Sequence, residues 1–250
     1  MDEKTTTMLP VGRSPATRRS RTVLTVALFG TLCLYALYHL GIPSCRTRTE
    51  SWLPKSQEEL VVTGDKLVPL EAHIISKCPD TRDCLKELVL PAMQRVHDKV
   101  NFKLSFIGKP TDNDGVDCKH GPAECLGNII ELCAQQLYPD PKTYLGFTMC
   151  LTREYKEIPQ RSLIEDCALE HAINFDALNE CATKDDGGYG IGLLRKSVQR
   201  TAEAGVTKSC TVRLNNEIYC IRDDGKWKDC PSGPGVNDLV IAVEKLYRSH

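Results

Sequence analysis

The apolar and polar positions from residue 67 to residue 107 predict a strand, a helix and a second strand. Residues 67–76 are aliphatic with partial alternation and residues 100–107 alternate clearly, so we expect both ranges to form β-strands. Asp80 or Thr81 is placed to begin a helix between them, and Pro91 is expected to kink that helix rather than start another. The apolar positions of this helix recur at helical spacing: Leu85, Leu88, Val89, Met93 and Val96. The order predicts a βαβ unit with parallel strands.

Beyond this unit the pattern becomes helical and then alternating again. From residue 121 to 205, helical segments are separated by proline and glycine clusters, which predicts a helical insert. Asn215-Asn216 is expected at a hairpin turn, because asparagine tolerates the left-handed conformation, and residues 223–225 at a second turn. Residues 236–247 are expected as a closing amphipathic helix. The order βαβ, helical insert, ββα, with a cysteine at the first strand-to-helix junction, predicts a thioredoxin-like α/β fold.

An uninterrupted apolar run precedes the predicted domain. Residues 22–42 contain no charged side chain, and a helix of that length spans about 30 Å, so we expect a single transmembrane signal anchor. The basic residues before it favour a cytosolic tail over residues 1–21 and a lumenal side for the rest of the chain. Residues 43–65 are expected as a stalk, and residues 66–250 as the lumenal domain. The alternative is a signal peptide cleaved after the apolar run.

Composition narrows the compartment and the partners. The 250 residues carry a formal net charge of -1 and are 41% hydrophobic, which suits a folded domain and gives no reason to expect nucleic acid as a partner. Of the 13 cysteines, Cys33 lies inside the apolar run, which leaves an even number beyond it. Because the chain has no paired Cys-x2-Cys knuckles, an oxidising endomembrane lumen with several disulfides explains these cysteines better than metal sites do.

One motif identifies a family resemblance. Residues 118–133 read CKHGPAECLGNIIELC, which resembles the signature of the gamma-interferon-inducible lysosomal thiol reductase family, Cys-Gln-His-Gly-x2-Glu-Cys-x2-Asn-x4-Cys. Lys119 replaces the glutamine, and the matching positions are Cys118, His120, Gly121, Glu124, Cys125, Asn128 and Cys133. The layout resembles that of the family over roughly residues 66–248. The resemblance implies a thioredoxin-like fold and a lysosome-like, vacuole-like or secretory compartment.

The same motif has a physical interpretation of its own. Cys125 and Cys133 lie eight residues apart on one expected helix, about 12 Å along its axis, so they cannot bond to each other. Each therefore needs a partner on another element. His120 and Glu124, one helical turn apart, could form a zinc site with Cys118, but no fourth ligand is evident. We expect His120 to support a loop or the helix start instead, and no metal or other cofactor.

The resemblance also implies a reactive cysteine pair. It implies a thiol reductase whose nucleophile lies at the first strand-to-helix junction in a Cys-x2-Cys pair, and Cys78 occupies that junction. The second cysteine comes later, at Cys84, which gives Cys-x5-Cys. In the implied reaction the Cys78 thiolate attacks a disulfide of a substrate protein, Cys84 resolves the mixed disulfide, and a small-thiol or protein reductant restores the pair. A bridge between them requires Cys78 to lie on a non-helical turn. The alternative is a structural disulfide in a redox-inactive binding or scaffold domain.

A further cysteine takes a position at which thioredoxin-like folds usually have a cis-proline. Counting back from Asn215 places Cys210 there, on the side where a substrate would bind, and no proline occurs between Pro159 and Pro231. Cys210 is therefore a candidate partner of Cys78 or Cys84. A hairpin centred on residue 215 would instead place Cys210 opposite Cys220, and this geometry favours the Cys210–Cys220 pairing.

Overall fold

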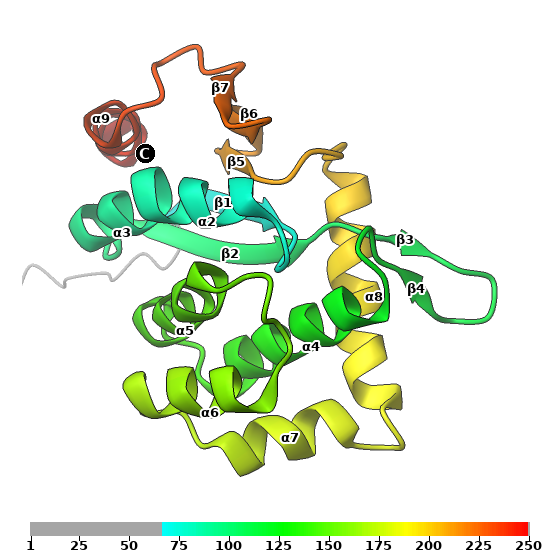
Figure 1. Cartoon of the computed structure of the whole chain (residues 1–250). Helices are drawn as coiled ribbons and strands as arrows, with labels where there is room; N and C mark the ends of the chain where they lie inside the picture. The colour runs from blue at the N-terminus through cyan, green and yellow to red at the C-terminus, as the bar shows by residue number, and fades with distance from the viewer. Residues whose placement is uncertain (1–66, 250) are drawn as a thin grey trace, which may run out of the picture. The chain divides into compact units, whose positions relative to one another are not determined.

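The computed structural model describes residues 67–249, which fold around a five-stranded sheet (Figure 1). The strands follow the order β2-β1-β5-β6-β7, in which β1 and β2 are parallel and the other neighbours are antiparallel. Their bounds are β1 Val68–Ile74, β2 Val100–Phe106, β5 Thr211–Leu214, β6 Glu217–Asp223 and β7 Lys226–Lys228. A separate short hairpin, β3 Lys109–Pro110 with β4 Val116–Asp117, extends from the body of the domain. The predicted parallel strand pair is confirmed; the short hairpin was not predicted.

The helices have the predicted order. Their bounds are α2 Pro79–Cys84, α3 Leu90–Val96, α4 Pro122–Leu137, α5 Pro141–Arg153, α6 Arg161–Glu170, α7 Phe175–Thr183, α8 Gly188–Glu203 and α9 Val236–Ser249. Between α2 and α3 the chain continues through a π-helical turn, η1 Leu85–Val89, in which the Leu90 N–H donates to the Leu85 carbonyl. Pro91 follows at once and has no N–H to donate to the preceding turn. As predicted, it does not start a separate helix; the wider turn accommodates it.

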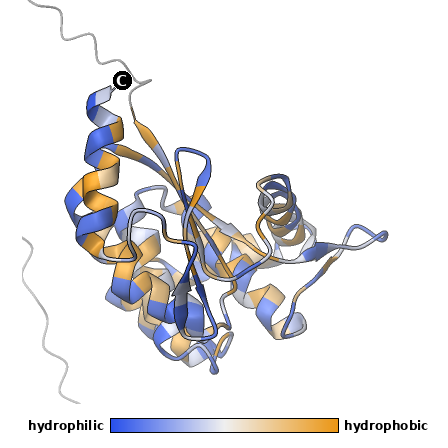
Figure 2. Cartoon of the chain, turned by 90° about the horizontal axis from the view of Figure 1, so that it is seen from above, coloured by the Kyte–Doolittle hydropathy of each residue, from blue (hydrophilic) through white to orange (hydrophobic). Residues whose placement is uncertain are grey.

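The two faces of the central strand carry different side chains. Leu70, Ala72 and Ile74 alternate on one face of β1 and are buried in the apolar core, toward α3 and α9. Glu71 and His73 point to the opposite face, where α8 lies. Figure 2 shows apolar residues along the strands of the sheet and on the helices that cover it. The sheet is therefore covered on both faces, as in other sheets with parallel strands.

A buried charged network joins α8 to the sheet. Glu71 accepts hydrogen bonds from Arg200 and Arg213, and its Oε2 lies 3.3 Å from His73 Nε2. His73 Nδ1 lies 2.9 Å from Thr201 Oγ1. Burial opposes the charged form of Glu71, but the Arg200 and Arg213 guanidinium groups and the His73 hydrogen bond outweigh it and lower the pKa of Glu71. Burial lowers the pKa of His73, which favours its neutral form.

Disulfides hold the helical insert together. Cys133 on α4 bonds to Cys181 on α7, and Cys150 on α5 bonds to Cys167 on α6. The expectation that Cys125 and Cys133 bond to partners elsewhere is confirmed, since Cys125 bonds to a cysteine outside its helix. The helices of the insert are thus held together by apolar contacts and by two disulfides, one between the successive helices α5 and α6 and one between α4 and α7.

The C-terminal elements have the predicted hairpins. Leu214 pairs with Glu217 across Asn215 and Asn216, which have φ values of 50° and 67°. A second turn at Asp224-Gly225 brings Trp227 beside Arg222. The apolar side of α9 is buried at Leu239, Val240 and Val243.

The predicted tail, membrane anchor and stalk over residues 1–21, 22–42 and 43–65 lie outside the described residues. From residue 67 to residue 249, none of the helices has both the length and the apolar character needed to span a bilayer.

Candidate functional site

Cys78 lies where the sheet meets the first helix. It is the N-cap of α2, with extended backbone angles of φ −117° and ψ 128°, and Pro79 occupies the first turn. Both features follow from the sequence, because proline favours an extended residue before it and suits the first position of a helix. Cys78 forms no disulfide within residues 67–249 and is 7% exposed.

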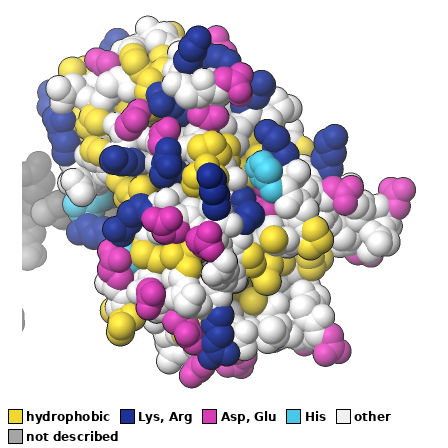
Figure 3. Space-filling view, in the orientation of Figure 1, with side chains coloured by type: hydrophobic (Ala, Val, Ile, Leu, Met, Phe, Trp, Pro, Cys, Tyr) yellow, Lys and Arg dark blue, Asp and Glu magenta, His cyan; other side chains and the backbone are white. Residues whose placement is uncertain are grey.

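A cavity of about 920 Å³ opens beside Cys78. Its other walls come from the loop that follows α8, from the start of the β3–β4 hairpin, and from the loop that carries Cys118 and Lys119. Its charged lining is mixed in sign: Asp80, Lys109, Asp117, Lys119, Lys208, Asp223 and Asp224. Acidic and basic side chains are also mixed on the face of the domain seen in Figure 3. The lining therefore gives no preference for a strongly acidic or strongly basic substrate.

The structure does not form the bridge between Cys78 and Cys84. The helix begins directly at Pro79, so Cys84 lies six residues further along, about 9 Å by the rise of an α-helix. The non-helical turn that such a bridge requires is absent. Cys84 is bonded instead to Cys210 on the loop before β5, and both cysteines are fully buried.

The favoured pairing of Cys210 with Cys220 is wrong. A register shift between Val212 and Arg213 places Cys220 opposite Val212, and Cys220 bonds to Cys230. Cys210 instead faces Arg222, with backbone hydrogen bonds of 3.1 and 2.8 Å. The turn is centred between Asn215 and Asn216 rather than on residue 215, which moves Cys220 one position away from Cys210, and the bulge, which has no clear sequence signal, moves it by a second position.

Two hydroxyl side chains connect the Cys78 loop to Cys210, and neither was predicted. Thr81 is buried at the position where the family pattern has its second cysteine, and its hydroxyl lies 2.9 Å from the Ile75 carbonyl oxygen. Ser209 Oγ accepts from the Ile75 N–H at 2.9 Å and lies 2.8 Å from Thr81 Oγ1. The Ser209–Cys210 peptide bond is cis. The loop before β5 is thus hydrogen-bonded to both sides of Cys78.

The first half of the family motif forms a loop closed by a buried carboxylate. Glu124 is fully buried and accepts hydrogen bonds from the backbone N–H groups of Lys119 and His120, each 3.1 Å long. The His120 ring also contacts this carboxylate. Gly121 has a φ of 79°, which an L side chain rarely adopts. The expectation that His120 supports the helix start is confirmed.

The second half of the motif holds the Cys78 loop. The Asn128 side chain accepts from the Ser76 N–H at 3.1 Å, and its amide nitrogen lies 3.9 Å from Cys118 Sγ. Cys118 is bonded to Cys125. A Cβ on Gly127 would contact Ile158 and would lie 2.8 Å from Ser76 Oγ, so glycine is needed for this close approach. The motif residues therefore position the loop that carries Cys78.

Charged side chains around α2 are paired with nearby groups. Lys77 Nζ donates to the carbonyl oxygens of Lys156 and Ile158. Asp80 accepts from the Asp224 and Gly225 N–H groups at 3.1 and 2.9 Å. Of these residues, Asp80 and Asp224 line the cavity beside Cys78, so their contact joins two parts of its wall.

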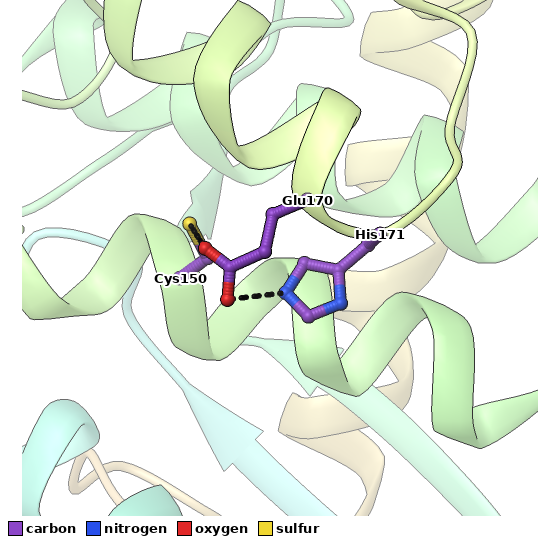
Figure 4. A group of neighbouring side chains, drawn as sticks. All are labelled: Cys150, Glu170 and His171. Carbon is purple, nitrogen blue, oxygen red and sulfur yellow. Dashed lines mark hydrogen bonds and ion pairs between the residues drawn. The ribbon is translucent and has the colours of Figure 1, made fainter.

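One group of potential metal ligands occurs among the described residues, on α5 and at the end of α6, and none of its members lines the cavity beside Cys78. Cys150 Sγ, a Glu170 oxygen and a His171 nitrogen lie within 4.8 Å of one another (Figure 4). The sulfur is already bonded to Cys167, and Glu170 pairs with Arg153 at 2.9 Å. Cys118, the sulfur of the zinc alternative considered above, is likewise in a disulfide. A disulfide sulfur is not the thiolate that zinc binds.

The fold and the motif define a class of protein. A crystal structure of a provisionally assigned protein disulfide isomerase from Nitrosomonas europaea superposes with a TM-score of 0.50 and 11% identity over 74% of this chain and 99% of that one. This likeness concerns the fold alone. The described domain is a mixed α/β, thioredoxin-like domain with many disulfides.

The family follows from sequence comparison. The model of the gamma interferon inducible lysosomal thiol reductase family matches residues 69–171. GILT-like protein 1 of Drosophila melanogaster is 30% identical over 168 residues, which cover 60% of this chain and 67% of that protein. The gamma-interferon-responsive lysosomal thiol protein of Arabidopsis thaliana is 28% identical over 124 residues, covering 47% of this chain and about half, 51%, of that protein. The chain belongs to the gamma-interferon-inducible lysosomal thiol reductase family, and this membership supports a role in thiol–disulfide exchange.

Proposed function

We propose that this domain is a thiol–disulfide oxidoreductase that reduces disulfides of substrate proteins, with Cys78 as the attacking residue. The observation that carries the proposal is the place of Cys78: an unbonded cysteine among residues 67–249, at the N-terminus of α2 and beside a large cavity. Backbone N–H groups at a helix N-terminus stabilise a thiolate, which is the reactive form. The motif residues hold the loop in place through Asn128.

The reaction proceeds through a mixed disulfide. The Cys78 thiolate attacks one sulfur of a substrate disulfide, forms a Cys78–substrate disulfide and releases the other substrate sulfur as a thiolate. A second thiolate then attacks the Cys78 sulfur and releases the remaining substrate thiolate. Resolution by Cys84, as the sequence predicts, requires that Cys84 first be released from Cys210. A small thiol or a protein reductant supplies the two electrons.

The direct test compares the reduced protein with Cys78→Ser in reducing a disulfide-bonded peptide. We expect the wild type to reduce the peptide and to form a Cys78–peptide adduct that mass spectrometry detects after alkylation. The variant should do neither, and a matched control, Cys150→Ser with Cys167→Ser, should retain activity because that disulfide lies away from the cavity. Equal activity of Cys78→Ser and the wild type would contradict the proposal. A native disulfide between Cys78 and Cys45, the cysteine that lies between the apolar run and the described residues, would also contradict it.

The second candidate is a redox-inactive scaffold or binding domain of the same fold. Two observations favour it: Thr81 stands at the position of the family's second cysteine, and Cys84 is held by Cys210. The same experiment separates the candidates, because a scaffold gives no adduct and no peptide reduction.

We also propose a lumenal domain anchored by residues 22–42, with residues 1–21 cytosolic. Five disulfides among the described residues support an oxidising compartment. Protease digestion of sealed microsomes tests this topology: the domain should be protected until detergent is added. Digestion without detergent would contradict the lumenal location.

A further inference from the structure

Three cysteines meet at the junction of α2 and β5, and they differ in accessibility. Cys78 lines the cavity and is 7% exposed, whereas Cys84 and Cys210 are 0% exposed. A disulfide on a substrate protein can therefore approach Cys78 but cannot reach the bonded pair. Any exchange between a substrate and the pair has to pass through Cys78.

Of the two cysteines in the buried disulfide, Cys210 has the closer connection to the Cys78 loop, because the residue before it is hydrogen-bonded to that loop. Ser209 directly precedes Cys210 and is hydrogen-bonded to Ile75 and Thr81, which lie three residues before and after Cys78. Ser209 also lines the same cavity as Cys78. Cys84 lies further down the helix, about 9 Å from Cys78 along its axis. Its Cα is 6.3 Å from that of Cys210, within the usual range for a disulfide.

We infer that Cys210 resolves the mixed disulfide and passes the bond to Cys84, so that the three cysteines form a relay. This inference rests on the proposed function. In the reduced protein, the Cys210 thiolate attacks the Cys78 sulfur of the Cys78–substrate disulfide, forms a Cys78–Cys210 disulfide and releases the substrate thiolate. The Cys84 thiolate then attacks the Cys210 sulfur, forms the Cys84–Cys210 disulfide and releases Cys78 as a thiolate.

The electrons balance over this sequence. One substrate disulfide is reduced to two thiols, and the thiols of Cys84 and Cys210 are oxidised to one disulfide. Cys78 is unchanged at the end, and the end state has the bonding seen from residue 67 to residue 249, where Cys84 is joined to Cys210 and Cys78 has no disulfide partner. The relay also accounts for the pattern of substitutions: Thr81 stands where a resolving cysteine would be, and Cys210 supplies the missing thiol from the facing loop.

The relay is tested by a single turnover. The full chain is reduced with a dithiol, freed of reductant and mixed with one equivalent of a peptide that contains one disulfide. Samples are quenched with an alkylating agent and every cysteine is assigned by mass spectrometry. The wild type should end with Cys78 alkylated and Cys84 bonded to Cys210. Cys84→Ser should accumulate the Cys78–Cys210 disulfide, and Cys210→Ser should accumulate the Cys78–peptide adduct with Cys84 alkylated.

Other outcomes would overturn the relay. If Cys210→Ser releases the peptide as fast as the wild type, or if a Cys78–Cys84 disulfide forms, Cys210 is not the resolving residue. Failure of the proposed function looks different, because then no variant forms a Cys78–peptide adduct. Circular dichroism of each variant excludes misfolding, and Cys210→Ala provides a second substitution at the same site. The eight cysteines of the other four disulfides are assigned in the same spectra before and after the peptide is added, and they serve as internal controls because their bonding should not change.

Discussion

Glu131 should make the free energy of unfolding of the domain decrease as the pH rises, which is the opposite of the usual effect of a carboxyl group. This residue on α4 is fully buried, and neither of its carboxyl oxygens has a hydrogen-bond partner among the described residues. The nearby Thr148 hydroxyl also has no hydrogen-bond partner within residues 67–249. Burial disfavours the carboxylate and raises the pKa of Glu131 well above its usual value, although the nearby Thr148 hydroxyl acts in the opposite direction. The folded chain therefore holds a proton on Glu131 that the unfolded chain releases.

The direction and the size of the change in stability with pH follow from this bound proton. The stability contributed by the neutral acid is fully present below the unfolded pKa of about 4.3, and is lost as the pH rises through the folded pKa. Between these two values the free energy of unfolding should fall by about 1.4 kcal/mol for each pH unit from this group alone. Glu131→Gln removes the titration while keeping the shape, so the variant should become progressively more stable than the wild type as the pH rises.

Denaturant unfolding of both proteins, with disulfides intact, at a series of pH values measures the effect. Glu165→Gln is the matched control, because that glutamate forms an exposed pair with Arg161 on the surface of α6. The control should follow the wild type. Parallel curves for Glu131→Gln and the wild type would show that the carboxyl is not held neutral, and would refute the reasoning.

Three further substitutions test the packing around the site. Gly127→Ala places a Cβ against Ile158 and Ser76, so we expect thermal denaturation to show a loss of about 1–3 kcal/mol and Cys78 to react faster with an alkylating agent. Asn128→Ala leaves the buried Ser76 N–H without its acceptor, which should cost about 1–3 kcal/mol and speed hydrogen exchange of that amide; unchanged exchange would argue against the bond. Glu71→Gln leaves two arginines without their carboxylate and should cost about 3 kcal/mol near neutral pH. Because the pKa of Glu71 is lowered, this loss should shrink in denaturation experiments as the pH falls below about 4, through the folded pKa.

Much of the fold could be predicted because its signals are local. The strand periods, the Asn215-Asn216 turn and the apolar side of the closing helix each depend on a few neighbouring residues. The π-helical turn before Pro91 was not predicted. The sequence shows only that proline interrupts the hydrogen bonds of a helix, and not how the helix backbone adjusts to it. The β3–β4 hairpin was missed because its strands are two residues each and carry no alternation.

The site was harder to predict, because its partners are distant in sequence. The family motif correctly drew attention to residues 118–133, but not to the contact of Asn128 with Ser76, 52 residues earlier. The bond between Cys84 and Cys210 joins residues 126 apart, and the bulge in the β5–β6 hairpin shifts the position that Cys210 faces. The pairing of the cysteines was the hardest part of the site to predict, because the spacing of cysteines in a sequence is compatible with many different sets of disulfides. Thr81 and Ser209 carry no signal on their own, since buried hydroxyl groups are common wherever a loop backbone needs a partner.

The disulfides are nested, and this arrangement decides what reduction of each bond would do. The Cys84–Cys210 bond closes a covalent ring that contains three smaller rings, while the Cys220–Cys230 ring lies outside it. In a chain-entropy model, closing a ring of 126 residues restricts the unfolded chain by about 5 kcal/mol. Opening the outer ring would remove that restraint and leave the inner rings closed. Reduction of the Cys84–Cys210 disulfide would therefore remove the covalent link between α2 and the loop before β5. The disulfides within the helical insert would remain closed.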